Sequence, residues 1–290
     1  MTPFTPQQQQ IIVQAFKQRL GNHFSVFTPL YIRQIHLGFV NTFFAHLIYR
    51  DLSPYAQEYQ GGINILADSW IQAGKLLEST AKNWHTAGLY DGWRDEQFDV
   101  IDKQGNVLFA LERSAFRPLG LLSHAIHING YIEKNGEHYF WIGKRSPHKP
   151  VDPNRLDNLT GGGVASGETI HSAMIREGFE EAGLPENLLK PLNESACCLS
   201  VRPVHRGLHR EYLHIYNVRL PENFIPENQD GEVATLTLMS IPEILTHIEN
   251  NQFMNDAILA MVYAFIELGY LSESPLFTHG QPEKSSMILS

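Results

Sequence analysis

Residues 161–184 of this chain read GGGVASGETIHSAMIREGFEEAGL, a glycine-rich start followed by a run that ends in clustered acids. Glu177, Glu180 and Glu181 stand at positions i, i+3 and i+4, and residues with this spacing share one face of an α-helix. Carboxylates on one helical face repel one another, and no lysine lies among these three. Such a cluster becomes favourable when a hard divalent cation binds its oxygens. The stretch therefore predicts a metal site on a helix over residues 169–182, which follows a pliant glycine loop.

The order and spacing of the glycines, the acids and Arg176 in this stretch resemble the Nudix box, the signature of hydrolases that cleave a diphosphate linked to another moiety. One position departs from the pattern, because Gly178 stands where that family usually has an aliphatic residue. Glycine costs about 1 kcal/mol of helix propensity relative to alanine. We expect the neighbouring Phe179 to supply the missing apolar contact.

Further segments extend this resemblance to one Nudix subgroup: GWRDE at 92–96, LERSA at 111–115, WIGKRS at 141–146 and DGEV at 230–233. That subgroup joins an N-terminal DUF4743-type domain to a Nudix domain. It is similar to the Nudix part of thiamine pyrophosphokinase fusions and their stand-alone relatives. The resemblance implies hydrolysis of thiamine diphosphate, or of its damaged oxo and oxy forms, to the monophosphate and phosphate.

The composition restricts the partners. The chain has 290 residues, 43% of them hydrophobic, and a net charge of -9. An acidic surface does not favour nucleic acid or anionic membrane, so we expect neither as a partner. We expect no signal peptide at the N-terminus, because a basic stretch followed by an apolar core is missing there, and the apolar run 37–49 is too short to span a bilayer. Cys197 and Cys198 are adjacent, give no disulfide or zinc spacing and fit a reducing cytoplasm.

The pattern of apolar residues predicts an α/β chain in two parts. Residues 1–118 are expected to form a small α+β domain of the DUF4743 type, and residues 119–272 the Nudix domain, followed by a flexible tail at 273–290. For the second domain the resemblance implies an α/β/α sandwich with a mixed sheet. Helices are expected at 4–21, 36–50, 69–87, 169–182 and 255–268, with another opened by the capping box at 240–243. Strands are expected at 97–101, 107–111, 124–132, 138–143, 196–201, 211–220 and 233–240.

The acids divide into predicted roles. Glu177, Glu180 and Glu181 are expected to bind Mg²⁺ or Mn²⁺. Glu168 either joins the metal shell through water or favours the positive end of the helix dipole. Arg176 is expected to orient a glutamate through a salt bridge. Either Glu177 or Glu232 could activate the attacking water, so both are candidate general bases.

Cations before the glycine loop are the predicted phosphate ligands: Lys144, Arg145 and Lys149. Arg145 is favoured because a guanidinium can bind phosphate in a bidentate manner. Asp157 is placed to contact the remainder of the substrate. A second basic group and several aromatic residues could also reach it, and the sequence does not choose among them: Arg202, Arg206, Arg210, Trp93, Phe140, Trp141, Tyr212 and Tyr216.

Other functions stay open at this point. The substrate could be a nucleoside diphosphate sugar, a dinucleotide or a dNTP. An isomerase of the isopentenyl-diphosphate type is disfavoured, because both cysteines follow the glutamates. A noncatalytic binding module would not need all three clustered acids. We therefore expect a small-molecule diphosphate as the partner, with a homodimer left open.

Overall fold

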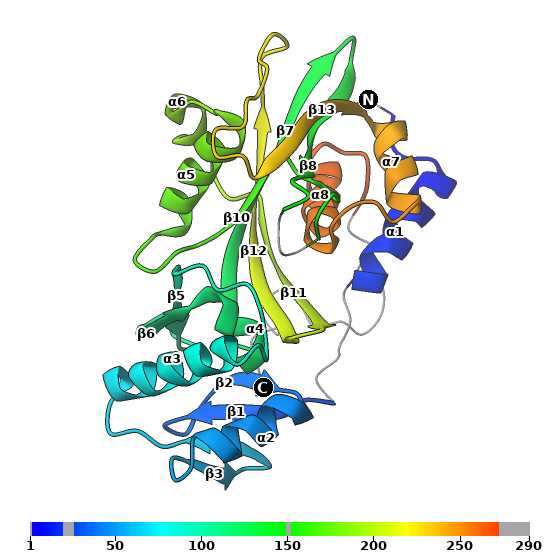
Figure 1. The fold of residues 1–290 in the computed structure, drawn as a ribbon. Helices are drawn as coiled ribbons and strands as arrows, with labels where there is room; N and C mark the ends of the chain where they lie inside the picture. The colour runs from blue at the N-terminus through cyan, green and yellow to red at the C-terminus, as the bar shows by residue number, and fades with distance from the viewer. Residues whose placement is uncertain (1, 20–25, 149–151, 273–290) are drawn as a thin grey trace.

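The computed structural model describes residues 2–19, 26–148 and 152–272, which form two regions stacked end to end (Figure 1). The predicted phosphate ligand Lys149 and the predicted tail at 273–290 lie outside the described residues. Among the described residues, no helix combines the length and the apolar character needed to cross a membrane.

The first region is built on a four-stranded sheet with the order β2-β1-β4-β3 and a separate hairpin, β5–β6. Buried apolar side chains of its strands and helices form one core, which includes Phe44, Leu77 and Trp84. The elements are β1 (Thr28–Ile32), β2 (Ile35–Val40), α2 (Thr42–Asp51), β3 (Ala56–Tyr59), β4 (Gly62–Ile65), α3 (Trp70–Thr86), β5 (Gln97–Ile101), β6 (Val107–Glu112), the 3₁₀ turn η2 (Arg113–Ala115) and α4 (Phe116–Leu119).

The helix predicted over residues 36–50 is wrong in its first part. Residues 35–40 form β2, which pairs with β1, and the helix α2 begins only at Thr42. Asn41 ends the strand and caps the helix, since its side chain accepts a hydrogen bond from the Phe44 backbone nitrogen at 2.9 Å. The apolar run was therefore two elements joined at a cap, not one helix.

The second region contains a mixed sheet with the order β11-β12-β7-β8-β13, in which β10 also pairs with β7 and β9 with β8. The β7–β12 pair is parallel, and the pairs β7–β8, β8–β13, β11–β12 and β10–β7 are antiparallel. The strands are β7 (Ser123–Lys134), β8 (Glu137–Arg145), β9 (Leu156–Asp157), β10 (Thr160–Gly163), β11 (Ala196–Val204), β12 (Gly207–Arg219) and β13 (Val233–Ser240).

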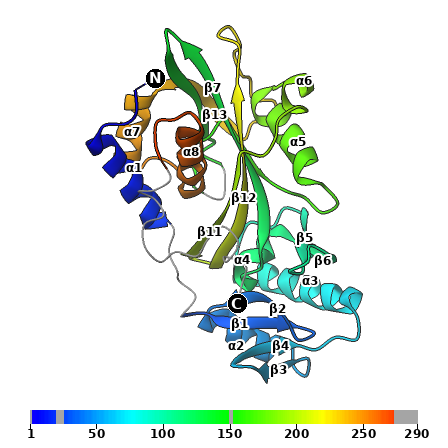
Figure 2. The same cartoon turned by 180° about the vertical axis from the view of Figure 1, so that it is seen from behind.

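Helices cover both faces of this sheet, which gives the predicted α/β/α sandwich (Figures 1 and 2). One face packs against α5 (Ile170–Ala182) and α6 (Glu186–Leu189) through a core that contains Ile128, Met174 and Tyr216. The other face packs against α7 (Ile241–Glu249) and α8 (Asn255–Glu267) through Phe140 and Phe265.

The first helix, α1 (Pro6–Arg19), belongs to the second layer of helices and not to the first region. Its buried Ile12 and Phe16 share a core with α7 and α8. Phe4, just before it, stacks on Tyr270 with ring centroids 5.3 Å apart. The division at residue 118 stays a prediction, and these contacts attach the start of the chain to the second region.

The helix that carries the clustered acids, α5, is defined at both ends. Thr169 forms a capping box with Ser172, and Gly183 ends the helix in the left-handed conformation at φ 62°. The expected role of Phe179 is wrong, since its side chain is 57% exposed. Gly178 itself faces the sheet, and a Cβ there would lie 2.7 Å from Leu189 Cδ1. Glycine at position 178, in place of the usual aliphatic residue, thus permits a close approach of α5 to α6.

Candidate active site

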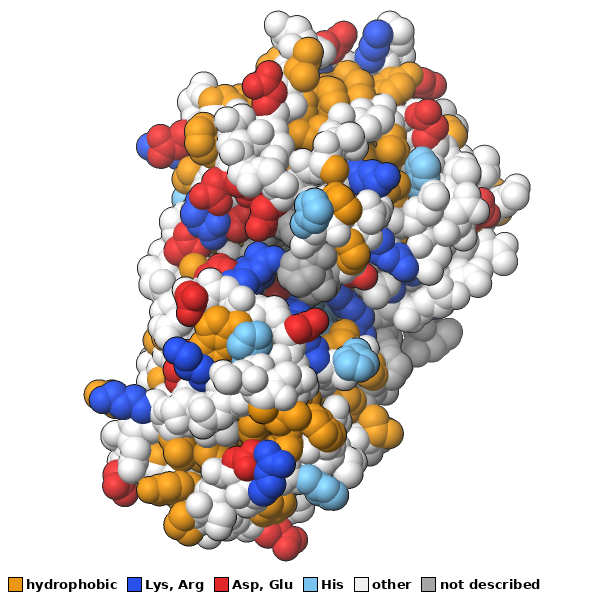
Figure 3. All heavy atoms as spheres, in the orientation of Figure 1, with side chains coloured by type: hydrophobic (Ala, Val, Ile, Leu, Met, Phe, Trp, Pro, Cys, Tyr) orange, Lys and Arg blue, Asp and Glu red, His pale blue; other side chains and the backbone are white. Residues whose placement is uncertain are grey.

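A pocket of about 240 Å³ lies at the junction of the two regions. The space-filling view shows acidic and basic side chains gathered at this level of the molecule (Figure 3). Among the described residues that line the pocket, eight are arginines and eight are aspartates or glutamates. The opposite charges of the two sets offset each other, which lowers the free-energy cost of burying them.

The glycines before α5 are not the loop that we expected. Thr160–Gly163 form the strand β10, in register with residues 125–128 of β7. The strand passes close beneath the acidic helix, and a Cβ at Gly162 would lie 2.0 Å from the Glu177 carboxylate. Glu181 is fixed on the same strand, because its Oε2 accepts a hydrogen bond from the Gly161 nitrogen at 2.8 Å. Glycine is therefore needed here for the approach of a carboxylate to the backbone.

Arg176 lies at the centre of the acids of α5. Its guanidinium donates to Glu168 at 2.6 and 2.8 Å, to Glu177 at 2.7 Å and to Glu180 at 3.1 Å. A further bond reaches the Gly163 carbonyl at 3.2 Å. The hydrogen bond from Arg176 lowers the pKa of the Glu168 carboxyl group. Arg176 thus contacts the glutamates, while its orienting role stays a prediction, and Glu168 has a contact that neither sequence alternative included.

A second group of acids offers a cation site. Oxygens of Glu181, Asp230 and Glu232 all lie within 4.8 Å of one another, and the last two come from the loop before β13. An all-oxygen, all-anionic set suits a hard divalent cation. Glu177 and Glu180 line the same pocket but contact Arg176. The residues thus fit a divalent metal, with Asp230 as a candidate ligand that the sequence reasoning missed.

The predicted phosphate ligands fall on different sides of β8. Arg145 lines the pocket and donates to Asp157 at 2.9 Å, so these two candidates lie together. Lys144 is exposed and is not among the lining residues. The difference follows from the strand, in which successive side chains point to opposite faces.

The far end of the pocket holds a buried ionic network. Arg202 donates to Asp256 at 2.6 and 3.0 Å, and the Ser200 hydroxyl donates to the same carboxylate at 2.6 Å. Although burial acts against it, Arg202 and His209 hold the pKa of Asp256 well below its ordinary value. Arg117 donates to His209 at 3.1 Å, and burial lowers the pKa of Arg117 to about 10.

The other two members of the second basic group also line the pocket. Arg206 donates to the Asp91 carbonyl at 2.7 Å. Arg210 donates to the Gly120 carbonyl at 2.9 Å and lies over the Phe39 ring, which ties the two regions together. None of the five aromatic residues offered by the sequence is among the lining residues, and neither cysteine is.

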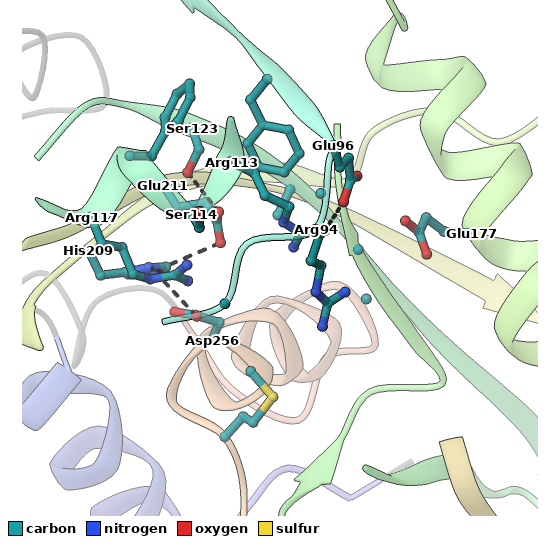
Figure 4. Close-up of a pocket in the computed structure, with 18 of the residues that line it drawn as sticks. Arg94, Glu96, Arg113, Ser114, Arg117, Ser123, Glu177, His209, Glu211 and Asp256 are labelled. Carbon is teal, nitrogen blue, oxygen red and sulfur yellow. Dashed lines mark hydrogen bonds and ion pairs between the residues drawn. The ribbon is translucent and has the colours of Figure 1, made fainter. Parts of the chain in front are cut away.

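The first region supplies one wall of the pocket. Arg94, Glu96 and Arg113 line it, and Figure 4 shows them between Glu177 and the network around His209. Arg113 lies over the Phe98 ring, 4.9 Å from its centroid, and is paired with Glu96. The sequence reasoning did not name these side chains as site residues, although it used their segments for the subgroup resemblance. Much of the pocket comes from residues 176–256, and no local pattern links those positions to residues 94–113.

Comparisons with known proteins show the family to which this chain belongs. The sequence profile of the NUDIX domain matches residues 124–260, which include α5 and all of the mixed sheet except the first residue of β7. An uncharacterized Nudix hydrolase of Nostoc sp. is 34% identical over 170 residues, which are 59% of this chain and 95% of that protein. The chain belongs to the Nudix family.

The similarity to other Nudix proteins also reaches beyond the family domain. Nudix hydrolase 24, chloroplastic, of Arabidopsis thaliana is 28% identical over 246 residues, which are 83% of this chain and 67% of that protein. Among solved structures, that of DR0079 from Deinococcus radiodurans covers 58% of this Nudix chain and 98% of its own, with 21% identity and a TM-score of 0.42. This Nudix protein is thus a hydrolase acting on acid anhydrides in phosphorus-containing compounds.

Proposed function

We propose that this Nudix hydrolase is a metal-dependent diphosphatase of thiamine diphosphate, or of its oxo and oxy analogues, and releases the monophosphate and phosphate. The observation that carries the proposal is one pocket in which the acids of α5 meet guanidinium groups from both regions. Residues 92–96 and 111–115, which resemble the thiamine-related subgroup, both contribute lining side chains, Arg94, Glu96, Arg113 and Ser114 among them.

The chemistry needs a cation and a positioned water. Glu181, Asp230 and Glu232 would hold Mg²⁺ or Mn²⁺, which offsets charge on the diphosphate oxygens. The water oxygen attacks one phosphorus, the bond from that phosphorus to the bridging oxygen breaks, and a carboxylate takes the proton of the water. Glu177 and Glu232 are the candidates for this step, and both line the pocket. Arg145 and the arginines of the first region would bind the phosphate oxygens.

The charge and size of the pocket support a small substrate. The lining acids and arginines are equal in number, so their charges balance. A complex of a divalent metal with a diphosphate carries little net charge and would keep that balance, whereas a triphosphate would add negative charge. The volume of about 240 Å³ lies below the usual range for ligand pockets, roughly 300–1,000 Å³, and disfavours a dinucleotide. The far end offers both donors and acceptors for an amino-substituted ring.

A nucleoside diphosphate sugar is the second candidate. It is favoured by the lack of an open aromatic face for a thiazolium cation among the described lining residues. Phe98 and Phe116 line the pocket, but the guanidinium of Arg113 already lies over Phe98.

The free cysteines, Cys197 and Cys198, support the proposal that the protein works in a reducing compartment such as the cytoplasm.

Phosphate and monophosphate release from a substrate panel tests this proposal. The panel contains the diphosphates of thiamine, oxothiamine and oxythiamine, an ADP-sugar and deoxynucleoside phosphates, each assayed with Mg²⁺. We expect the highest kcat/KM for a thiamine-type diphosphate, and a higher value for any nucleotide would overturn that assignment. Glu181→Gln should reduce kcat/KM at least tenfold. The matched variant Glu186→Gln removes an exposed carboxylate paired with Lys190 on α6 and should keep full activity.

A further inference from the structure

Arg94 differs from the other arginines around the acids, because its guanidinium is weakly engaged. Among the described residues its one ion pair is with Glu232, at 3.4 Å, and its side chain is 30% exposed. By contrast, Arg176 contacts three carboxylates, Arg113 is paired with Glu96, and Arg145 donates to Asp157 at 2.9 Å.

The backbone that carries Arg94 is held firmly. The buried carboxylate of Glu112 accepts hydrogen bonds from the backbone nitrogens of Arg94, Glu96 and Ser114, each at 3.2 Å. Gly92, at the start of this segment, has φ 88° and lies against the Arg206 guanidinium, which donates to Asp91. The segment therefore places the Arg94 side chain at the pocket without fixing its tip.

The electrostatic surroundings of Arg94 favour an anion. Burial, together with the nearby charges of Arg113 and Arg145, lowers the pKa of Arg94. Three guanidinium groups that are close together repel one another, and a multivalent anion bound between them would offset this repulsion. Figure 4 shows Arg94 extending from the first region into the pocket, between Arg113 and Glu177.

We propose that Arg94 is a substrate-binding residue, whose guanidinium contacts Glu232 and would move to the diphosphate oxygens when metal and substrate bind. The proposal deepens the proposed diphosphatase function and rests on it for the identity of the substrate. Glu181, Asp230 and Glu232 would hold the metal, so Glu232 would no longer be available to Arg94. The Arg94 guanidinium could then pair with the substrate phosphates instead.

Two binding measurements on the full chain test this proposal without requiring turnover. The first is the Kd for Mn²⁺ alone, and the second is the Kd for inorganic diphosphate in the presence of Mn²⁺. Arg94→Gln should weaken diphosphate binding roughly ten- to hundredfold, which is the range for a lost charged hydrogen bond. It should leave Mn²⁺ affinity equal or tighter, because Glu232 loses a competing cation. Arg94→Lys should restore part of the diphosphate affinity.

Arg50→Gln is the matched control, since Arg50 is an exposed arginine of the same region that is paired with Asp51. It should leave both constants unchanged. Diphosphate affinity of Arg94→Gln within twofold of the unaltered protein would overturn the proposal, as would weaker Mn²⁺ binding, which would make Arg94 a support for the metal site. If the unaltered protein hydrolyses no thiamine-type diphosphate, the proposed function fails, and these constants still decide the role of Arg94.

Discussion

Replacing Gly162 by alanine tests whether the Glu177 carboxylate must lie against β10. The new Cβ would stand 2.0 Å from the Glu177 Cδ and Oε1 atoms, whereas ordinary contacts begin at 3.4 Å, so the carboxylate has to move by about 1.4 Å. That movement disturbs the 2.7 Å bond from Arg176. A displacement of about 1 Å at a reacting group can reduce a rate about a hundredfold. We therefore expect kcat to fall by about that factor.

Steady-state kinetics and urea denaturation together separate this effect from unfolding. Gly162 is not in the left-handed region of φ, so the strand backbone itself admits alanine, and urea denaturation shows how much stability the displaced carboxylate costs. Gly161→Ala is the graded comparison, because its Cβ would meet the His127 ring at 3.1 Å and require only a small shift. A Gly162→Ala enzyme with kcat within threefold of the unaltered one would refute the placement of Glu177.

Three further predictions concern charge. Glu181→Gln should weaken Mn²⁺ binding at least tenfold in calorimetry because one clustered carboxylate is lost, and an unchanged Kd would argue against this cation site. Asp256→Asn leaves Arg202 buried without its counter-ion and should lower the free energy of unfolding by about 3–5 kcal/mol, a loss that urea denaturation would measure. Arg176 lowers the pKa of Glu168 below its ordinary 4.5, so this pair stabilises the fold above that pH and the stabilisation is lost as the pH falls through the lowered value. Glu168→Gln should therefore be less stable than the unaltered protein at pH 7, with a difference that shrinks in acid.

The acidic helix was predictable because its signal is local. A period of 3.6 residues brings Glu177, Glu180 and Glu181 to one face whatever surrounds them. The capping box at Ser240 and Glu243 is equally local and was confirmed. The Nudix fold and hydrolase activity followed from the same short stretch.

The remaining features depend on partners that are distant in sequence. The strand β10 is made of residues with poor strand propensity, and only its pairing with β7 makes it a strand. The strand β2 was missed for another reason, because its apolar residues continue into α2 and were read with it as one helix. Asp230 and Arg94 meet near Glu232 from loops more than 130 positions apart, and no periodic pattern relates them.

The attachment of α1 to α7 and α8 has a consequence for how the two regions can be separated. Residues 26–119 leave the second region after α1 and rejoin it at β7, so they resemble an insertion held at both ends more than a module added in front. A cut at residue 118 would remove Ile12 and Phe16 from the second core and expose the helices beneath them. A separable Nudix domain should therefore be made by joining α1 to β7 through a short linker. Two points of attachment also restrict rotation of the first region, which keeps its wall of the pocket facing the acids.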